Sequence, residues 1–396
     1  MGHAMVKNET MTINMGPQHP STHGVLQLIL ELDGEIVKKA TPHIGFLHRG
    51  IEKLSEHRTY HQVIPLTDRL DYLAPMHNNL GYVLAVEKLL GLTEAIPERA
   101  KVVRVMLAEL TRIKSHLVWL ACHALDIGAM TVFIYCFRER ERIMDMYEKL
   151  SGARMTSNYF RIGGLSADLP AGFEQDVRSF IDEMPGHIDT YEGLLTGNKI
   201  WQKRLQGVGT ISAKDAIDLG VTGPSLRGSG VDWDLRRDLP YSGYETYDFK
   251  VAVDAGCDTW ARYKVRLIEM RESVKIVRQA LDRLKPGPIL ADAPKVVLPP
   301  KKDVVNSIEG LIHHFKIISE GFKPEAGEIY LGVENPKGEV GFFIVSDGSP
   351  RPYRMKIRPA SFVNLQALPK MAEGQMLADL VAVIGTLDIV LGEIDR

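Results

Sequence analysis

Cysteine is scarce in this sequence. Only three of its 396 residues are cysteines, Cys122, Cys136 and Cys257, and no two of them form a CxxC pair. Disulfide frameworks and thiolate metal sites both need cysteines in larger numbers or at closer spacing, so neither is predicted. The odd count is typical of a protein from a reducing compartment.

An excess of charge of either sign is also missing. The chain has 48 lysines and arginines against 50 aspartates and glutamates, a formal net charge of −2, and this balance gives no reason to expect a nucleic-acid partner. Hydrophobic residues make up 45% and charged residues 25%. Such a composition is typical of a folded globular chain and excludes a disordered one.

No long apolar run is free of charge. The best candidate for a membrane span, residues 117–137, carries Asp126 near its middle. A carboxylate at that depth costs about 2.5–3.5 kcal/mol, so this stretch is better interpreted as two buried helices joined near residues 124–128. We therefore expect any membrane association to come through partner proteins.

Familiar nucleotide and metal motifs are absent too. There is no P-loop and no HExxH, and the Gly-Ser-Gly at 228–230 lacks the third glycine of a dinucleotide fingerprint. The sequence predicts no NADH, ATP or zinc site in this chain. Residues 1–5 resemble a cloning remnant, although they could equally be native, and we leave them out of the fold argument.

Regular elements are predicted at both ends and in the middle. Alternating leucines and the Asp33-Gly34 turn predict a hairpin over residues 24–40, preceded by an irregular loop over 16–24 that contains two prolines. Apolar residues at helical spacing predict two long helices, the second about 37 Å long. The first seam consists of Val103, Met106, Leu110, Ile113, Leu117 and Leu120, and the second of Trp260, Tyr263, Leu267, Met270, Val274, Val277, Leu281 and Leu284.

The second half adds strands after a proline-rich stretch. Short strands are predicted over 328–333, 340–345 and 353–357, with a last helix over about 373–387. The predicted class is therefore α+β, with a central bundle of long helices between N-terminal and C-terminal β segments. We divide the chain into an N-terminal β segment with a functional loop, a helical bundle, a proline-rich connector and a C-terminal α/β segment, with bounds 11–75, 76–285, 286–302 and 303–396.

Titratable residues gather in four segments beside apolar elements. They are the loop that ends at His23, PHIGFLHRGIEK at 42–53, the segment around Tyr72 (67–77) and the last residues 385–396. Function is often carried by such loops, but on its own a loop histidine is more often structural than functional.

Together these segments carry a family resemblance. From about residue 11 to residue 396 the chain resembles the D subunits of bacterial NADH:quinone oxidoreductases, which form the quinone site of respiratory complex I. Nine motifs in order carry the resemblance: GPQHPSTHGV, PHIGFLHRGIEK, DRLDYL, FRERE, NYFRIGG, YSGYETYDF, MRESVKI, RPASFVNLQ and LGEIDR.

The same family is related to the large subunit of nickel–iron hydrogenases, whose fold the resemblance implies here. The hydrogenase RGxE segment persists at 49–52. Asp71 and Ala74 stand where the first pair of metal-binding cysteines would be. Nickel and iron in such sites need soft thiolates, so the resemblance implies that no metal is bound by this chain and that quinone occupies the vacated pocket.

The C-terminal hydrogenase motif has changed in the same way. Asp388 remains, but Val390 and Glu393 replace the second pair of cysteines and Arg396 replaces the histidine. A hydrogenase-like metalloenzyme is the alternative that these replacements nearly exclude. A second alternative stays open, in which the chain is a scaffold that holds a cluster-bearing partner and donates no protons.

The resemblance also implies roles for individual residues. Tyr72 and His23 would donate protons to the two quinone carbonyls, and Asp126 beside His23 would favour the imidazolium form. The residues implied at the quinone are Ser21, Thr22, His23 and Tyr72, and those near a partner's cluster are Arg49 and Arg69. An ion pair with Glu52 or Glu56 is the competing interpretation of Arg49.

Partners and cofactors follow from the same resemblance. The chain would be a peripheral subunit at the cytoplasmic face of the bacterial inner membrane, held by iron–sulfur subunits and membrane subunits of a proton-translocating complex. The iron–sulfur clusters and FMN would belong to those partners, with quinone as substrate. One position departs from the usual pattern, because Thr156 stands where many relatives have a titratable histidine, which puts redox-linked protonation there in doubt.

Overall fold

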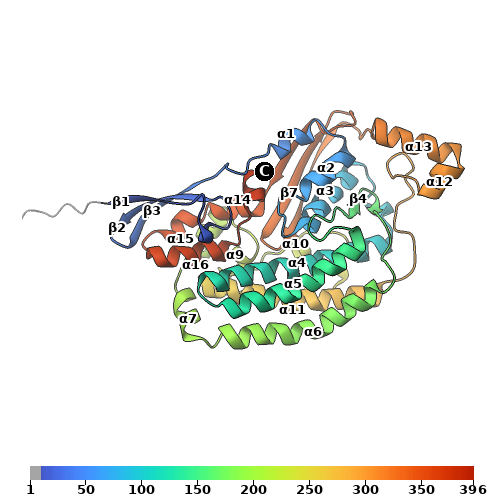
Figure 1. Ribbon diagram of the computed structural model, residues 1–396. Helices are drawn as coiled ribbons and strands as arrows, with labels where there is room; N and C mark the ends of the chain where they lie inside the picture. Colours follow the sequence, from blue (N-terminus) through green and yellow to red (C-terminus); the bar gives the residue numbers. More distant parts are fainter. Residues whose placement is uncertain (1–9) are drawn as a thin grey trace, which may run out of the picture.

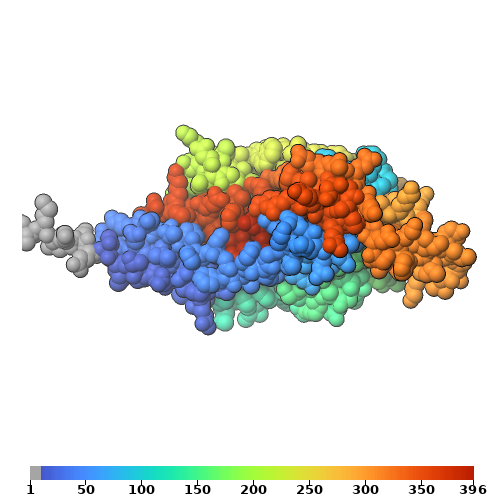
Figure 2. Space-filling view, turned by 90° about the horizontal axis from the view of Figure 1, so that it is seen from above, coloured from blue at the N-terminus to red at the C-terminus, as the bar shows by residue number. Residues whose placement is uncertain are grey.

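The computed structural model describes residues 10–396, so the predicted cloning remnant lies outside the described residues. Long helices form one layer, and two three-stranded antiparallel sheets lie beside it (Figure 1). The predicted α+β class is confirmed. The N-terminal strands and the helical segment of residues 301–319 occupy opposite ends of the molecule (Figure 2).

The N-terminal sheet has the order β1-β2-β3, formed by Met11–Met15, Gln27–Asp33 and Ile36–His43. The predicted hairpin is confirmed, with Gly34 at a φ of 61° in its turn. Leu28, Leu30 and Leu32 alternate inward and are buried, as the sequence pattern requires. Strand β1 was not predicted, because five mostly exposed residues give almost no periodic signal.

The central layer is a bundle of long helices. Helix α4 packs against both α5 and α11, and α6 completes the layer (Figure 1). The two predicted seams lie on α4 and α11, and the predicted break near 124–128 falls between the end of α4 and the start of α5. The bounds are α3 Pro75–Leu89, α4 Glu98–Asp126, α5 Met130–Ser151, α6 Phe173–Leu195 and α11 Thr259–Arg283.

Shorter elements connect these helices. They are η1 Pro20–Thr22, α1 Ile51–Ser55, α2 Tyr60–Thr67, η2 Thr93–Ala95, β4 Phe160–Arg161, β5 Gly164–Leu165, α7 Lys199–Leu205, α8 Ala213–Asp218, α9 Pro224–Arg227, α10 Leu235–Asp238 and η3 Tyr244–Thr246. Within residues 10–396, no helix is both long enough and apolar enough to cross a membrane.

The C-terminal sheet has the order β6-β7-β8 and packs on α3. The three strands appear where the sequence predicts them. The helix predicted to be the last, over about 373–387, is α16, which begins at Leu377, and a further short helix, α17, follows it. The bounds are α12 Lys301–Asn306, α13 Ile308–Ser319, β6 Gly327–Asn335, β7 Gly338–Ser346, β8 Arg354–Arg358, α14 Ala360–Leu365, α15 Leu368–Ala372, α16 Leu377–Leu387 and α17 Leu391–Asp395.

The N-terminal and C-terminal segments are interleaved in space. Leu377 N donates to Glu35 O at 2.8 Å, and Val37 N donates to Gln375 O at 2.9 Å. In Figure 2 the blue N-terminal and red C-terminal surfaces lie side by side. The proposed division into four segments stays a prediction. Buried hydrophobic residues from these segments pack into one core.

A network of buried charges joins the bundle to the C-terminal sheet. Arg227 of α9 contacts Glu269 of α11 at 2.6 Å and Glu334 of β6 at 2.8 Å, and His116 of α4 reaches the second oxygen of Glu269 at 2.8 Å. Burial opposes the charged form, but the neighbouring carboxylates outweigh it and raise the pKa of Arg227. The guanidinium therefore stays charged in the core.

Glu109 of α4 is the second centre of this network. It accepts from Arg236 and Arg112, both at 3.2 Å, from Ser273 Oγ at 2.6 Å and from Tyr244 Oη at 2.7 Å. Burial alone would favour the protonated acid, yet the two guanidiniums and the two hydroxyls lower the pKa of Glu109 to about 2. Four elements distant in the sequence are fixed on this one carboxylate.

We expect Arg227→Met to destabilise the protein by about 3–5 kcal/mol, because it leaves Glu269 and Glu334 buried without their cation. The matched control is Arg271→Met, which removes a half-exposed arginine of the same helix layer that pairs with Asp189 and Glu192. That change should cost about 1 kcal/mol or less. Thermal unfolding of both purified variants measures the difference, and equal losses would contradict a structural role for the buried network.

Candidate functional site

The loop before β2 presents His23 to the end of α4. His23 has left-handed backbone angles (φ 51°), directly after the short helix η1. Its Nε2 lies 3.0 Å from Oδ2 of Asp126, the last residue of α4, and the two side chains are 21% and 13% exposed. The predicted neighbourhood of His23 and Asp126 is therefore present, across 103 positions of sequence.

Ser21 and Thr22 shape the same loop. The backbone N of Ser21 donates to His19 Nδ1 at 3.2 Å, and Thr22 Oγ1 donates to His19 O at 2.8 Å. Thr22 is fully buried, so its hydroxyl supports the loop from inside. The expectation that both residues touch quinone stays a prediction.

Tyr72 lies in a turn between α2 and α3 that Asp71 fixes. Asp71 Oδ1 accepts from Leu73 N at 3.0 Å and from Ala74 N at 3.3 Å. The Tyr72 side chain is half-buried, and its hydroxyl forms no hydrogen bond within residues 10–396. Burial, followed by the charge of Asp71, raises the pKa of Tyr72, which keeps the phenol protonated at neutral pH.

Arg49 lies in the segment between β3 and α1. Its guanidinium donates to the backbone carbonyls of Arg69 and Gly392, the second at 3.4 Å. Glu52 and Glu56 pair instead with other cations, at 3.2 Å with Lys356 and 3.0 Å with Arg354. The alternative of an Arg49 ion pair with either glutamate is wrong.

Arg69 points toward the helix before it. Its Nη1 donates to Pro65 O at 2.7 Å and lies 3.5 Å from Asp68, while the side chain is 47% exposed. The Arg49–Arg69 contact brings both predicted cluster-side residues together. That Arg49 and Arg69 lie near a partner's cluster stays a prediction.

Asp395 anchors the Arg49 segment to the C-terminal helix α17. Its two oxygens accept from Gly45 N at 2.8 Å and Leu47 N at 2.6 Å, while His48 Nδ1 lies 2.6 Å from its carbonyl oxygen. A carboxylate that binds two backbone amides fixes the path of the loop. The terminal motif of the sequence therefore holds the segment that carries Arg49.

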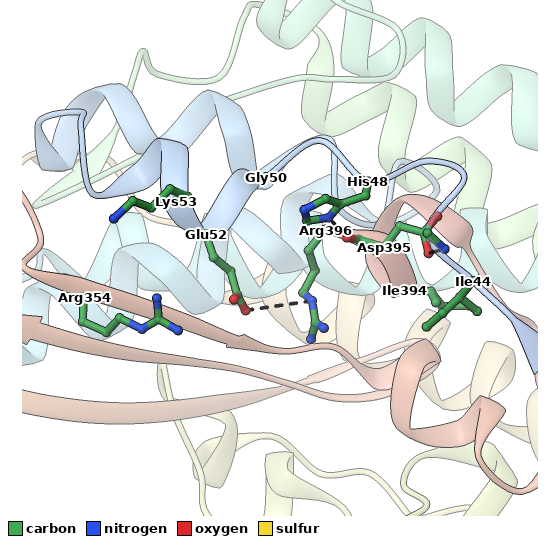
Figure 3. A pocket seen from close by; sticks show the side chains of 10 residues that line it. Ile44, His48, Gly50, Glu52, Lys53, Arg354, Ile394, Asp395 and Arg396 are labelled. Atoms are coloured by element: carbon green, nitrogen blue, oxygen red, sulfur yellow. Dashed lines mark hydrogen bonds and ion pairs between the residues drawn. The ribbon is translucent and has the colours of Figure 1, made fainter.

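A pocket of about 310 Å³ opens on the outer side of this segment (Figure 3). Glu52 and Arg396 face each other across it at 3.9 Å, with Arg354 and Lys53 at its rim. Neither Tyr72 nor His23 is among the residues that line it. We therefore treat this charged pocket as separate from the predicted proton donors.

The two segments aligned with hydrogenase metal motifs meet behind Tyr72. Lys337, from the turn between β6 and β7, lies 3.1 Å from Asp71 Oδ2 and 3.6 Å from Asp388 Oδ2, and its Nζ donates to Ser115 Oγ at 2.9 Å. Burial opposes the ammonium, but Asp388 and Asp71 outweigh it and raise the pKa of Lys337. We call Asp71, Lys337, Asp388 and Glu393 the carboxylate–lysine cluster.

Glu393, which the resemblance places at a hydrogenase cysteine position, accepts hydrogen bonds from the backbone and from a hydroxyl. Its carboxylate accepts from Ala360 N at 2.8 Å and from the amide and hydroxyl of Ser361 at 3.2 and 2.6 Å. Burial, then the charge of Asp71, raises the pKa of Glu393 to about 7. Within the described chain, no group of three or more His, Cys, Asp or Glu side chains is arranged to hold a metal ion.

Because Thr156 does not titrate, His123 and His187 are the next candidates for redox-linked protonation. His123 stacks on Trp119 with ring centroids 5.4 Å apart, and burial lowers its pKa to about 3, so it is neutral. His187 lies 3.4 Å from Glu139 between α6 and α5. Burial therefore argues against His123 as a group that titrates near neutral pH.

Lys337 and the buried network escaped sequence reasoning. A lysine in the turn Asn335-Pro336-Lys337-Gly338 has the composition of an exposed hairpin tip. Charges on α4 such as Glu109 and Arg112 fit a solvated helix face equally well. One signal was available in the sequence: charged residues are numerous on a helix whose apolar seam already predicts burial. Charged motifs in other segments offered possible partners for them.

Comparison with known proteins places the chain in a family. Residues 126–396 match the family model described as the 49 Kd subunit of respiratory-chain NADH dehydrogenase. The D subunit of the NADH-quinone oxidoreductase of Geobacter metallireducens is 75% identical over 99% of this chain and 100% of its own length. The protein of the same name from Geotalea uraniireducens is also 75% identical, and that from Geobacter sulfurreducens is 74% identical. Each match covers 99% of this chain and 100% of the relative. The chain therefore belongs to the family of NADH-quinone oxidoreductase D subunits, the respiratory 49 Kd subunit family.

Proposed function

We propose that this chain forms much of the quinone-reduction site of a proton-translocating NADH:quinone oxidoreductase and donates protons to the reduced quinone. The contact between His23 Nε2 and Asp126 is the observation that carries the proposal. It joins a loop histidine to the end of a long buried helix. There the acid–base pair can exchange protons with a ligand, and the resulting change in the charge of Asp126 acts on the helix.

Tyr72 supports the proposal as the second donor. Quinone takes up two electrons and two protons to become quinol, so the site needs two groups that release a proton. The Tyr72 phenol stays protonated at neutral pH, because burial raises its pKa, and its hydroxyl has no hydrogen-bond partner in the described chain. A donor held without an internal acceptor is suited to a ligand carbonyl.

The electrons come from outside this chain in our proposal. The names of the relatives specify NADH and quinone, and we infer that FMN and iron–sulfur clusters in partner subunits carry electrons between them. Arg49 and Arg69, which touch each other near α17, would face the last cluster, where positive charge favours its reduced form.

Assembly and location follow from the same proposal. The chain would sit at the cytoplasmic face of the bacterial inner membrane as a peripheral protein, between iron–sulfur subunits and membrane subunits. Quinone would enter between this chain and a partner, since the separate pocket beside Arg49 lacks both proposed donors.

We expect Tyr72→Phe to lower quinone reduction by roughly 10²–10⁴-fold, the usual contribution of general acid catalysis. The ring still fills its space, so the complex should assemble. NADH oxidation by an artificial acceptor that takes electrons upstream of quinone should stay normal. Both activities are measured on the same membranes.

Tyr147→Phe is the matched control. Its hydroxyl donates to Leu107 O at 2.9 Å deep in the bundle, so its loss should cost about 1 kcal/mol of stability and leave both activities intact. Near-normal quinone turnover in Tyr72→Phe would remove the proton-donor role and leave the scaffold alternative.

Elemental analysis of the purified chain should find no stoichiometric nickel, iron or zinc. Asp71 is engaged by backbone amides and by Lys337, and Glu393 by Ala360 and Ser361, so neither replaces a thiolate as a metal ligand. About one metal ion per chain would overturn the proposal that the hydrogenase pocket has been vacated.

The midpoint potential of the cluster next to this chain should vary weakly between about pH 6 and 8. Thr156 replaces a histidine in many relatives and does not titrate, and His123 is kept neutral by burial. A redox titration of the complex followed by electron paramagnetic resonance measures the slope. The full proton-coupled value of about 59 mV per pH unit would show that another group couples proton and electron.

A further inference from the structure

The tip of the β6–β7 hairpin is buried, although hairpin tips usually face water. Lys337 is 1% exposed, and its ammonium is enclosed by Asp71, Asp388 and Ser115. A buried ammonium costs several kcal/mol unless it is paired. Closure of the hairpin turn does not require a buried lysine, so the burial of Lys337 points to an additional role.

Close backbone packing lets the tip enter the core. A Cβ at Gly223 would lie 2.5 Å from Gly338 Cα, and one at Gly338 (φ +135°) would lie 2.5 Å from Thr222 Oγ1. Neither position therefore tolerates a side chain. Asn364 Nδ2 then donates to Lys337 O at 2.8 Å and fixes the turn at this depth.

The ammonium reaches the supports of both proposed proton donors. On one side is Asp71, whose other oxygen binds the amides of Leu73 and Ala74 and so holds the Tyr72 turn. On the other side is Asp388, which follows α16 with a left-handed φ of 53°. Helix α16 packs on η1, whose last residue Thr22 precedes His23. Burial raises the pKa of Asp388, and the charge of His23 acts to lower it.

We propose that Lys337 is a positioning residue for quinone reduction, whose ammonium bridges Asp71 and Asp388 and so sets the Tyr72 turn and the His23 loop together. The inference rests on the proposed function, because it assumes that Tyr72 and His23 donate protons to quinone. It adds to that function a buried group that touches no ligand and acts through two carboxylates.

Charge balance in the carboxylate–lysine cluster makes the role measurable. One ammonium serves three buried carboxylates, and burial raises the pKa of both Asp388 and Glu393. Removal of the cation would raise these pKa values further, so the carboxylates would bind protons at higher pH. The charged and titratable groups that face the cluster from neighbouring elements are Tyr72, His77, Lys114, Arg266 and His23.

The test uses Lys337→Met in the whole complex, with a short-chain water-soluble quinone as substrate. We expect kcat to fall about tenfold or more and KM to change less than about twofold, since the lysine touches no ligand. The acidic limb of the kcat profile should move up by about one pH unit, because the unpaired carboxylates stay protonated to higher pH. NADH oxidation by an upstream acceptor should be unchanged.

Asp388→Asn gives the opposite shift and decides the matter if Lys337→Met does not assemble. It leaves Lys337 paired with Asp71 and removes one negative charge, so the remaining carboxylates lose their protons at lower pH. We expect a similar loss of kcat with the acidic limb moved down. A purely structural role predicts no such movement in either variant.

Lys275→Met is the control, since it removes an exposed lysine paired at 2.8 Å with exposed Asp248. It should leave kcat and the pH profile unchanged. Normal kcat and an unmoved profile in the Lys337 or Asp388 variant, with Tyr72→Phe inactive, would overturn this inference alone. Near-normal turnover in Tyr72→Phe would instead overturn the proton-donor role of Tyr72 in the proposed function.

Discussion

Pairing of buried charge is the constraint on which this structure depends. The contact of Arg227 with Glu269 and Glu334 ties a short helix, the long helix α11 and the C-terminal sheet to one point. Glu109 does the same for α4, α10 and η3. Apolar seams alone permit helices to slide or rotate by a turn, whereas a buried carboxylate with several fixed donors accepts one arrangement. The positions of the His23 loop and the Tyr72 turn depend on that arrangement.

The carboxylate–lysine cluster follows the same rule beside the Tyr72 turn. Lys337 is carried by the sheet that the Glu334 contact fixes, three residues earlier in the chain. The depth of the ammonium is therefore set by the core network, and Asp71 and Asp388 are set by the ammonium. Through this chain of contacts the His23 and Tyr72 loops, which have little regular structure, are held by the rigid centre of the molecule.

The sequence predicts the elements well where periodicity carries the information. The alternating leucines of β2 and the seams on α4 and α11 are confirmed, and the break at 124–128 follows from Asp126. Strand β1 could not be predicted, because its mostly exposed residues give almost no periodic signal. The insertion of Lys337 could not be predicted either, because it depends on contacts with distant segments. The site residues came from resemblance, and periodicity alone would have left His23 as an ordinary loop histidine.

The resemblance to hydrogenases implies that carboxylates stand where metal-binding cysteines would be, and this has a physical consequence for the pocket. Asp71 and Glu393 are fully buried carboxylates, which need hydrogen-bond donors or a cation nearby. Backbone amides of α14 satisfy Glu393, and the Asp71 turn with Lys337 satisfies Asp71. Ala74 and Val390 stand at the other two cysteine positions implied by the resemblance, and their buried apolar side chains need no hydrogen-bond donors. In the proposed function this pocket is polarised, because the ammonium of Lys337 lies behind the Tyr72 turn, where a quinone carbonyl would develop negative charge.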